Sequence, residues 1–155
     1  MSLRSIHVKR IADLAAYIGQ EAGPTDWLLV TQHQIDVFAE LTQDRHWIHI
    51  DQKRAREELA FGNTVSHGLL TLSLLPRLAD QLLSVETYRH GLNYGFNRVR
   101  FTAPVRAGAS IRLRARIVAV DPVVNGIRLT RENVLEVNDA EKPALIAETV
   151  VLMYD

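Results

Sequence analysis

Three titratable side chains fall within one short segment of the sequence: Asp44, His46 and His49. The segment shows neither helical nor strand periodicity and is predicted to be a loop, where folds tend to place reactive groups. A neutral imidazole can take a proton from water near neutral pH, and a nearby carboxyl group can hold that water or supply a second proton. These residue types favour general acid/base chemistry. Two imidazoles and one carboxylate are also a loose set of metal ligands.

A second group of functional residue types, Ser66, His67 and Gly68, directly precedes a leucine-rich segment. That segment is predicted to be a helix, and the first amides of a helix have no partner within the helix. Such an entrance can bind a carbonyl oxygen or an anion. A lone Asp or His in a loop is more often a cap or a solvated charge. The acid, the two bases and the helix entrance together favour a functional site.

The leucine-rich segment, within residues 64–83, is predicted to be the helix around which the fold is built. From Leu69 onward its apolar residues fall on nearly every side at helical spacing, which is typical of a helix enclosed by protein. It is too short and too often interrupted by polar residues to span a bilayer, so no membrane association is expected. Pro76 lacks an amide hydrogen and predicts a kink near Ser73.

After this helix the apolar period changes to two, which predicts four strands at residues 94–101, 111–120, 127–137 and 144–154. Turn residues between them indicate an antiparallel meander. The last strand is apolar on both alternating faces through residue 151 and is expected to be central. A long sheet after one buried helix predicts an α+β fold in which the sheet wraps the helix.

The part of the chain before the core helix is predicted to be mostly helical. A helix is expected to begin after the N-cap Thr31 and to end near Gln43. Three weaker elements are a peripheral helix, a short edge strand and an exposed helix, at residues 6–20, 27–30 and 52–59. The whole chain, residues 1–155, is interpreted as one domain, with residues 1–26 as a peripheral N-terminal extension.

Composition narrows the classes of protein further. The 155 residues include no cysteine, which excludes disulfides and thiolate chemistry and fits a reducing compartment, so the cytoplasm is expected. The formal net charge is zero. Eight arginines lie between Phe96 and Arg131 against one acid, Asp121. Because Arg112 and its neighbours alternate with apolar residues, they indicate the solvated face of a strand, and no nucleic acid is expected as a partner.

One stretch of the sequence resembles a known family. Five residues, Phe38, Thr42, Asp44, Ile48 and His49, match the signature of the MaoC-like, (R)-specific enoyl-CoA hydratases, and Ser66-His67-Gly68 follows downstream. The resemblance covers roughly Trp27 to the C-terminus and implies a hot-dog fold, in which an antiparallel sheet wraps around a central α-helix.

Three residues depart from that signature: Gln43 replaces a Gly, His46 an Asn and Trp47 a Pro. This variation resembles the nodulation-protein-N-like branch of the family. By resemblance, Asp44 and His49 are the catalytic acid/base pair. Asp44 would either be protonated, if burial beside the core helix raises its pKa, or hold the water. Substrate-binding residues are expected at six positions: Gly68, whose amide would hold the thioester carbonyl, Ser66, His67, Ser73, His46 and Trp47.

The resemblance implies a hydro-lyase, an (R)-specific 2-enoyl-CoA hydratase or 3-hydroxyacyl-thioester dehydratase. Its substrate would be a thioester of coenzyme A or acyl carrier protein, with no further cofactor and no metal. A homodimer is expected, because a sheet on one helix leaves a long edge strand uncovered. Two alternatives remain open: a hot-dog thioesterase and a non-catalytic protein that binds acyl thioesters.

Overall fold

The computed structural model describes residues 4–155 and has the α+β architecture that the sequence predicts. Its main sheet is built from four long strands, β5 (His90–Phe101), β6 (Ser110–Val123), β7 (Gly126–Val137) and β8 (Leu145–Tyr154). Their pairings are antiparallel, in the order β6-β7-β8-β5. The predicted central position of the last strand is confirmed, because β8 lies between β7 and β5.

The predicted meander is only partly correct. Strands β6, β7 and β8 follow one another, but β5 pairs with β8 and not with β6. A complete meander would have left β8 at an edge, where one side of its backbone has no partner. The chain places β5 there instead, and β8 keeps Leu145, Ala147 and Val150 buried.

The N-terminal segment is not the peripheral helix that was predicted. It forms β1 (Ile6–Arg10), parallel to β4 (Leu83–Thr87), and then the 3-10 helix η1 (Ile11–Tyr17). Ile6 and Val8 are buried at alternating positions, and Ile11 and Leu14 belong to the same core cluster. The prediction failed because the strand-like alternation covers only residues 6–8, and the helix-like spacing of apolar residues begins at Ile11.

Two short strands extend the sheet beyond β6: β2 (Glu21–Ala22) and β3 (Leu28–Leu29), both antiparallel to it. The predicted edge strand near residues 27–30 is thus confirmed as β3. Together they cover much of the outer edge of β6. The other edge of the sheet, β5, has no neighbour among residues 4–155.

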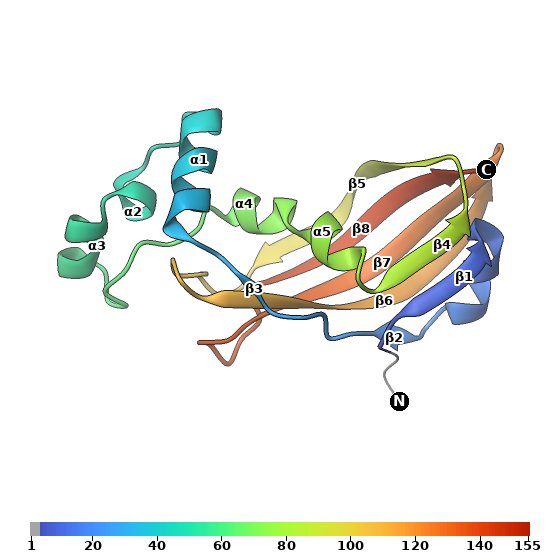
Figure 1. Ribbon diagram of the computed structural model, residues 1–155, viewed down its shortest axis with the longest axis horizontal. Helices are drawn as coiled ribbons and strands as arrows, with labels where there is room; N and C mark the ends of the chain where they lie inside the picture. The colour runs from blue at the N-terminus through green and yellow to red at the C-terminus, as the bar shows by residue number, and fades with distance from the viewer. Residues whose placement is uncertain (1–3) are drawn as a thin grey trace.

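The core helix is present but broken, as its proline predicts. It consists of α4 (Gly68–Ser73) and α5 (Leu75–Ala79), separated at Leu74, with Pro76 in the first turn of α5. The helix also ends earlier than expected, since Leu83 already begins β4. Figure 1 shows α4 and α5 in line across the concave face of the sheet. This is the hot-dog arrangement of a sheet around a helix.

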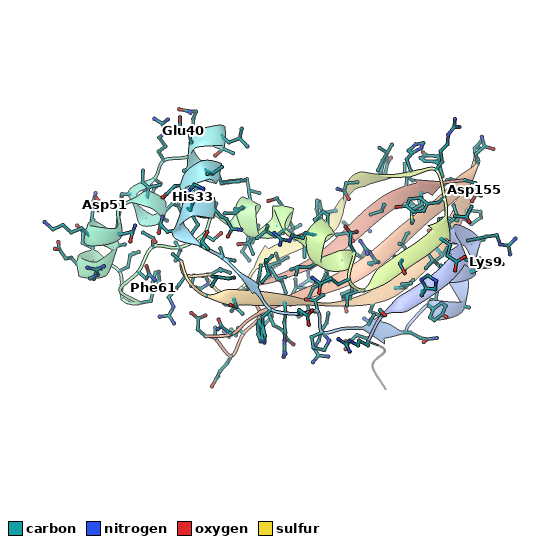
Figure 2. All side chains as sticks on the ribbon, in the orientation of Figure 1. Lys9, His33, Glu40, Asp51, Phe61 and Asp155 are labelled. Carbon is teal, nitrogen blue, oxygen red and sulfur yellow. The ribbon has the colours of Figure 1, made fainter. Side chains whose placement is uncertain are left out.

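Three more helices gather at one end of the molecule, beyond the long strands (Figure 1): α1 (Gln32–Thr42), α2 (Trp47–Ile50) and α3 (Gln52–Glu58). The hydroxyl of Thr31 caps α1 by accepting from the Gln34 amide at 3.2 Å, as predicted. Figure 2 labels His33 and Asp51 at this helical end, far from Lys9 and Asp155. No helix in residues 4–155 has the length and apolar content needed to cross a membrane.

The arginines that alternate along β6 pair with acids on neighbouring strands. Arg112 and Arg114 both contact Glu136 of β7, with N–O distances of 2.5 and 2.9 Å, and Arg116 contacts Glu132 at 2.9 Å. The predicted solvated strand face is confirmed. Because these charges are neutralised locally, they do not form a free basic surface.

The burial of Leu78 on α5 predicts how much the core helix contributes to stability. Leu78 is 0% exposed, whereas Leu41 of α1 is 80% exposed. We expect Leu78→Ala to lower the free energy of unfolding by about 2–5 kcal/mol, because it leaves a cavity under the sheet. Leu41→Ala, the matched control, should change it by less than about 0.5 kcal/mol. Denaturant titration measures both values, and equal losses would show that α5 is not part of the core.

Candidate active site

Asp44, His49 and His67 come together at the junction of the helical end and the core helix. One donor atom from each lies within 4.8 Å of the other two. Asp44 lies just after α1, His49 lies on α2, and His67 precedes α4. The predicted Asp44 and His49 are therefore neighbours in space, while the third member is His67 and not His46.

The backbone turns sharply just before Asp44. Gln43 ends α1 in the left-handed conformation, with φ of 61°, and its side chain donates to the Glu40 carbonyl at 2.6 Å. Glycine adopts this conformation without strain, whereas a residue with a Cβ has a penalty of about 1 kcal/mol. This explains physically why the family signature has glycine where this chain has Gln43.

Two hydrogen bonds fix the position of His49. Its ring Nδ1 lies 2.7 Å from the carbonyl oxygen of Val65 and must donate to it. Its backbone carbonyl accepts from the Gln32 side chain at 2.8 Å, and Gln32 in turn accepts from the Thr64 hydroxyl. With the proton on Nδ1, the Nε2 lone pair of neutral His49 is available as a base.

Partial burial lowers the pKa of His49 below its ordinary value of about 6.5. The Val65 carbonyl opposes this by stabilising the protonated ring, His67 and His46 lower the pKa further, and Asp44 raises it. His49 is therefore mostly neutral at pH 7. Since the folded state binds fewer protons than the unfolded chain just below pH 6.5, this shift makes stability decrease as the pH falls through that range.

His67 is a buried partner of His49 and does more than shape the loop. Its Nε2 lies 2.9 Å from the carbonyl oxygen of Asp44 and donates to it. Its ring stacks on that of His49 with centroids 3.7 Å apart and also contacts Phe38 at 4.9 Å. The ring is 3% exposed, and its Nδ1 has no hydrogen-bond partner in the described chain. His67 thus holds both the Asp44 backbone and the plane of the His49 ring.

Asp44 is exposed, which differs from the burial that was expected for it. The expected burial of Asp44 is therefore wrong, and its exposed carboxylate can accept hydrogen bonds from a water molecule. The donor atoms of Asp44, His49 and His67 could also hold a divalent ion. A metal would occupy the same lone pairs that acid/base chemistry requires.

Gly68, the first residue of α4, lies beside this cluster. Its amide has no hydrogen-bond acceptor within residues 4–155. A Cβ at this position would lie 3.1 Å from the Phe101 ring, so the glycine lets the end of β5 approach the helix. A larger side chain at position 68 would therefore clash with the Phe101 ring before it contacted a substrate. Ser66 is buried alongside, where its hydroxyl donates to the His67 carbonyl and accepts from Thr71, both at 3.1 Å.

The other predicted residues lie around the cluster in different roles. His46 is exposed, with its ring centroid 6.4 Å from that of His49. Trp47 is partly buried and packs under the Arg54 guanidinium at 4.2 Å, which indicates a structural contact between α2 and α3. Ser73 donates to the Leu70 carbonyl at 2.7 Å and lines a large cavity under α5.

Sequence reasoning missed the residues that hold the His49 ring. Gln32, Thr64 and Val65 act on His49 through its backbone and its ring nitrogen. Gln32 and Thr64 are typical helix-start and loop residues, and Val65 contributes only its carbonyl. No signal in the sequence marks these contacts, because they join segments 17 and 16 residues apart.

Comparison with known proteins identifies the family of this chain. Residues 13–139 match the MaoC-like domain family, and the chain belongs to that family. Over 142 residues it is 42% identical to the 3-hydroxyacyl-thioester dehydratase Z of Mycobacterium tuberculosis, covering 91% of this chain and 93% of that protein. It is 37% identical to nodulation protein N of Rhizobium leguminosarum bv. viciae over 96% of this chain and 93% of the relative.

A solved structure supports the fold. The crystal structure of an Archaeoglobus protein described as a monoamine oxidase regulatory protein superposes with a TM-score of 0.76. The sequences are 23% identical, and the match covers 99% of each chain. The predicted hot-dog fold and the resemblance to the nodulation-protein-N-like branch are both confirmed.

The contacts of His49 predict its titration. We expect its ring to titrate below pH 6.5, and His67→Gln to raise that pKa, because the amide keeps a donor for the Asp44 carbonyl but removes the stacked imidazole. His46→Gln, the control, should raise it less, since His46 has the smaller influence. NMR titration of the ring protons measures all three proteins. A lower pKa in His67→Gln would refute this account of the His49 environment.

Proposed function

We propose that this chain is an (R)-specific 2-enoyl thioester hydratase, which in the reverse direction dehydrates 3-hydroxyacyl thioesters. The observation that carries the proposal is the His49 ring, whose Nδ1 donates to the Val65 carbonyl and leaves Nε2 as the free base. A ring nitrogen of His49 lies within 4.8 Å of the Asp44 carboxylate. The similarity to a named 3-hydroxyacyl-thioester dehydratase across nearly the whole chain supports the same class of reaction.

In hydration, Asp44 and His49 act on one water molecule. The Asp44 carboxylate accepts a hydrogen bond from the water and orients it, and Nε2 of His49 takes a proton from it. The hydroxide adds to C3 of the enoyl group while the C2–C3 double bond opens towards the thioester. Protonated His49 then returns the proton to C2, so that one water has been added and both side chains regain their starting forms.

The developing negative charge on the thioester oxygen needs a donor. The Gly68 amide is the proposed donor, since it has no acceptor in residues 4–155 and lies next to the paired imidazoles in sequence and space. Ser66 and Thr71 support it indirectly by fixing the His67 carbonyl and the first turn of α4. The remaining predicted substrate contacts, His46, Trp47 and Ser73, stay predictions.

The acyl chain is proposed to lie in the cavity between the core helix and the sheet. This cavity has a volume of about 720 Å³ and is lined by Leu72, Leu75 and Ala79 from the core helix and by Val151 and Met153 from β8, among others. Its walls are mainly apolar, which suits the hydrocarbon part of an acyl group. We propose coenzyme A or acyl carrier protein as the carrier, no further cofactor, and the reducing cytoplasm as the compartment of a chain without cysteine.

Removing either member of the pair should abolish most turnover. We expect Asp44→Asn and His49→Ala each to lower kcat/KM for crotonyl-CoA hydration by about 10²–10⁴-fold, because the first removes the carboxylate that orients the water and the second removes the base that moves its proton. The measurement is loss of the conjugated-thioester absorbance, with release of free thiol followed separately. Thiol release without hydration would identify a thioesterase instead.

The matched controls are Asp121→Asn, whose carboxylate pairs with Arg128, and His33→Ala, at an exposed position of α1; neither residue belongs to the cluster. Both should keep near wild-type rates and the wild-type melting temperature. Losses below about tenfold in both site variants would contradict the assignment of the pair. Turnover should also survive exhaustive chelation, whereas loss that one divalent ion restores would turn the same three residues into a metal site.

A homodimer is proposed from the uncovered edge of β5. This strand pairs only with β8 in the described chain, yet it carries exposed aromatic and aliphatic side chains, at Leu92, Tyr94, Phe96 and Phe101. An open edge with apolar side chains favours association with another strand. A second copy paired along β5 would cover both the backbone edge and these side chains by two-fold symmetry.

Light scattering should therefore give twice the monomer mass at micromolar concentration. Tyr94 is 69% exposed, and we expect Tyr94→Lys to shift the population towards monomer, because a charge would be desolvated at the pairing edge. Val124, 84% exposed at the β6–β7 turn, provides the control Val124→Lys, which should leave the mass unchanged. A wild-type monomer would refute the dimer.

A further inference from the structure

Arg131 is a charged residue on the inner face of the sheet. It lies in the middle of β7, opposite Ile117 of β6 and Thr149 of β8. Leu129 and Asn133, two residues away on either side, point to the same face of the sheet, and each is 1% exposed. Arg131 lines the 720 Å³ cavity under α5, and on its other side it borders a small apolar space with Ile6 and Ala22 among others.

The Arg131 guanidinium has no partner in the described chain. Its Nε is buried and makes no hydrogen bond, and no acid lies within 4 Å of its nitrogens. Burial lowers the pKa of this guanidinium, and Asp80 alone opposes the shift from a distance. The arginines of the outer face differ, since Arg112 and Arg128 each have a carboxylate within 3.0 Å. An unpaired inward guanidinium is therefore not part of the ion-pair pattern of this sheet.

The other polar groups of the cavity wall do not accept hydrogen bonds from the Arg131 guanidinium. The Asn133 amide donates to the Arg131 and Ala147 carbonyls and to the Thr149 hydroxyl, at 3.0–3.2 Å. These bonds hold the backbone of β7 and β8 in register. The cavity wall combines apolar side chains with several polar ones, and Arg131 is the one cation among its described residues.

We propose that the cavity selects acyl chains that carry a carboxylate at the end remote from the thioester, with Arg131 binding that carboxylate. This inference rests on the proposed function, which places the acyl chain in the cavity. A guanidinium has only donors, so its ligand must accept hydrogen bonds. A carboxylate accepts two parallel bonds from the planar fork and supplies the missing negative charge. Apolar walls around the cation fit the methylene chain between the two ends.

Asp80 is a negative charge near Arg131, and its removal should have the opposite effect on ligand binding. It lies just after α5, lines the same cavity and is the one acid among the lining residues. It is exposed and too far from Arg131 for an ion pair, but its negative charge repels an incoming carboxylate. Removing that charge should therefore strengthen binding of a carboxylate-ended chain, whereas removing Arg131 should weaken it.

The experiment compares saturated coenzyme A thioesters, which bind but cannot be hydrated. Glutaryl-, adipyl- and suberyl-CoA are each titrated by calorimetry against valeryl-, hexanoyl- and octanoyl-CoA, which match them in length. We expect at least one carboxylate-ended chain to bind about tenfold or more tightly than its partner, as for a charged hydrogen bond in a sheltered site. The preference should disappear in Arg131→Met and increase in Asp80→Asn.

Arg128→Met is the control, because Arg128 lies on the same strand but faces outward and pairs with Asp121. It should keep the wild-type preference. Arg131→Met should melt at or above the wild-type temperature, since an apolar side chain replaces an unpaired buried charge. No carboxylate preference at any length, or a preference that persists in Arg131→Met, overturns the proposal. Hydration of crotonyl-CoA, assayed in parallel, reports on the proposed function independently.

Discussion

Two backbone carbonyls, each bound by an imidazole from another segment, hold the active site together. Val65 accepts from His49, and Asp44 accepts from His67, so the loop after α1 and the approach to α4 fix each other reciprocally. The Val65 amide closes the same junction by donating to the Ile48 carbonyl at 3.0 Å. Because a backbone carbonyl can only accept, these contacts determine the tautomer of both rings. The free Nε2 of His49 depends on these two hydrogen bonds.

The broken core helix connects the Asp44, His49 and His67 cluster to the large cavity under α5. At one end, α4 begins with Gly68, where the Phe101 ring fills the space that a side chain would occupy. At the other end, α5 forms one wall of the large cavity. The chemistry therefore lies near the start of the helix and the proposed acyl space lies along it. A change in the angle between α4 and α5 would alter the position of the thioester relative to its chain.

The sheet separates charges by face. On its outer face, arginines of β6 pair with acids of β7, and such half-exposed pairs contribute modestly to stability. On its inner face Arg131 has no such partner. The same strand thus carries Arg128 in a solvated ion pair and, three residues later, an arginine that faces the cavity. The pleat alone puts these two side chains in different environments.

The sequence by itself determined the fold class, the central position of β8, the break in the core helix just before Pro76 and the proximity of Asp44 and His49. These are local signals: hydrophobic periodicity, a missing amide hydrogen and a short motif are all read within a few residues. It also showed that Gln43 stands where glycine is usual. The conformation that makes glycine usual there, a positive φ at the end of α1, became visible only in the structure.

Tertiary structure decided what depends on contacts between distant segments. β5 joins β8 because a central position gives both edges of the β8 backbone a hydrogen-bonding partner, which the order of a simple meander would not provide. The N-terminal segment enters the core as β1 because β4, 77 residues away, offers it a partner. His67 joins Asp44 and His49 through stacking that no spacing in the sequence predicts. Arg131 is unpaired because no acid from another segment of the described chain reaches it. Local periodicity fixes which side of an element is buried, whereas only packing fixes what each buried group meets there.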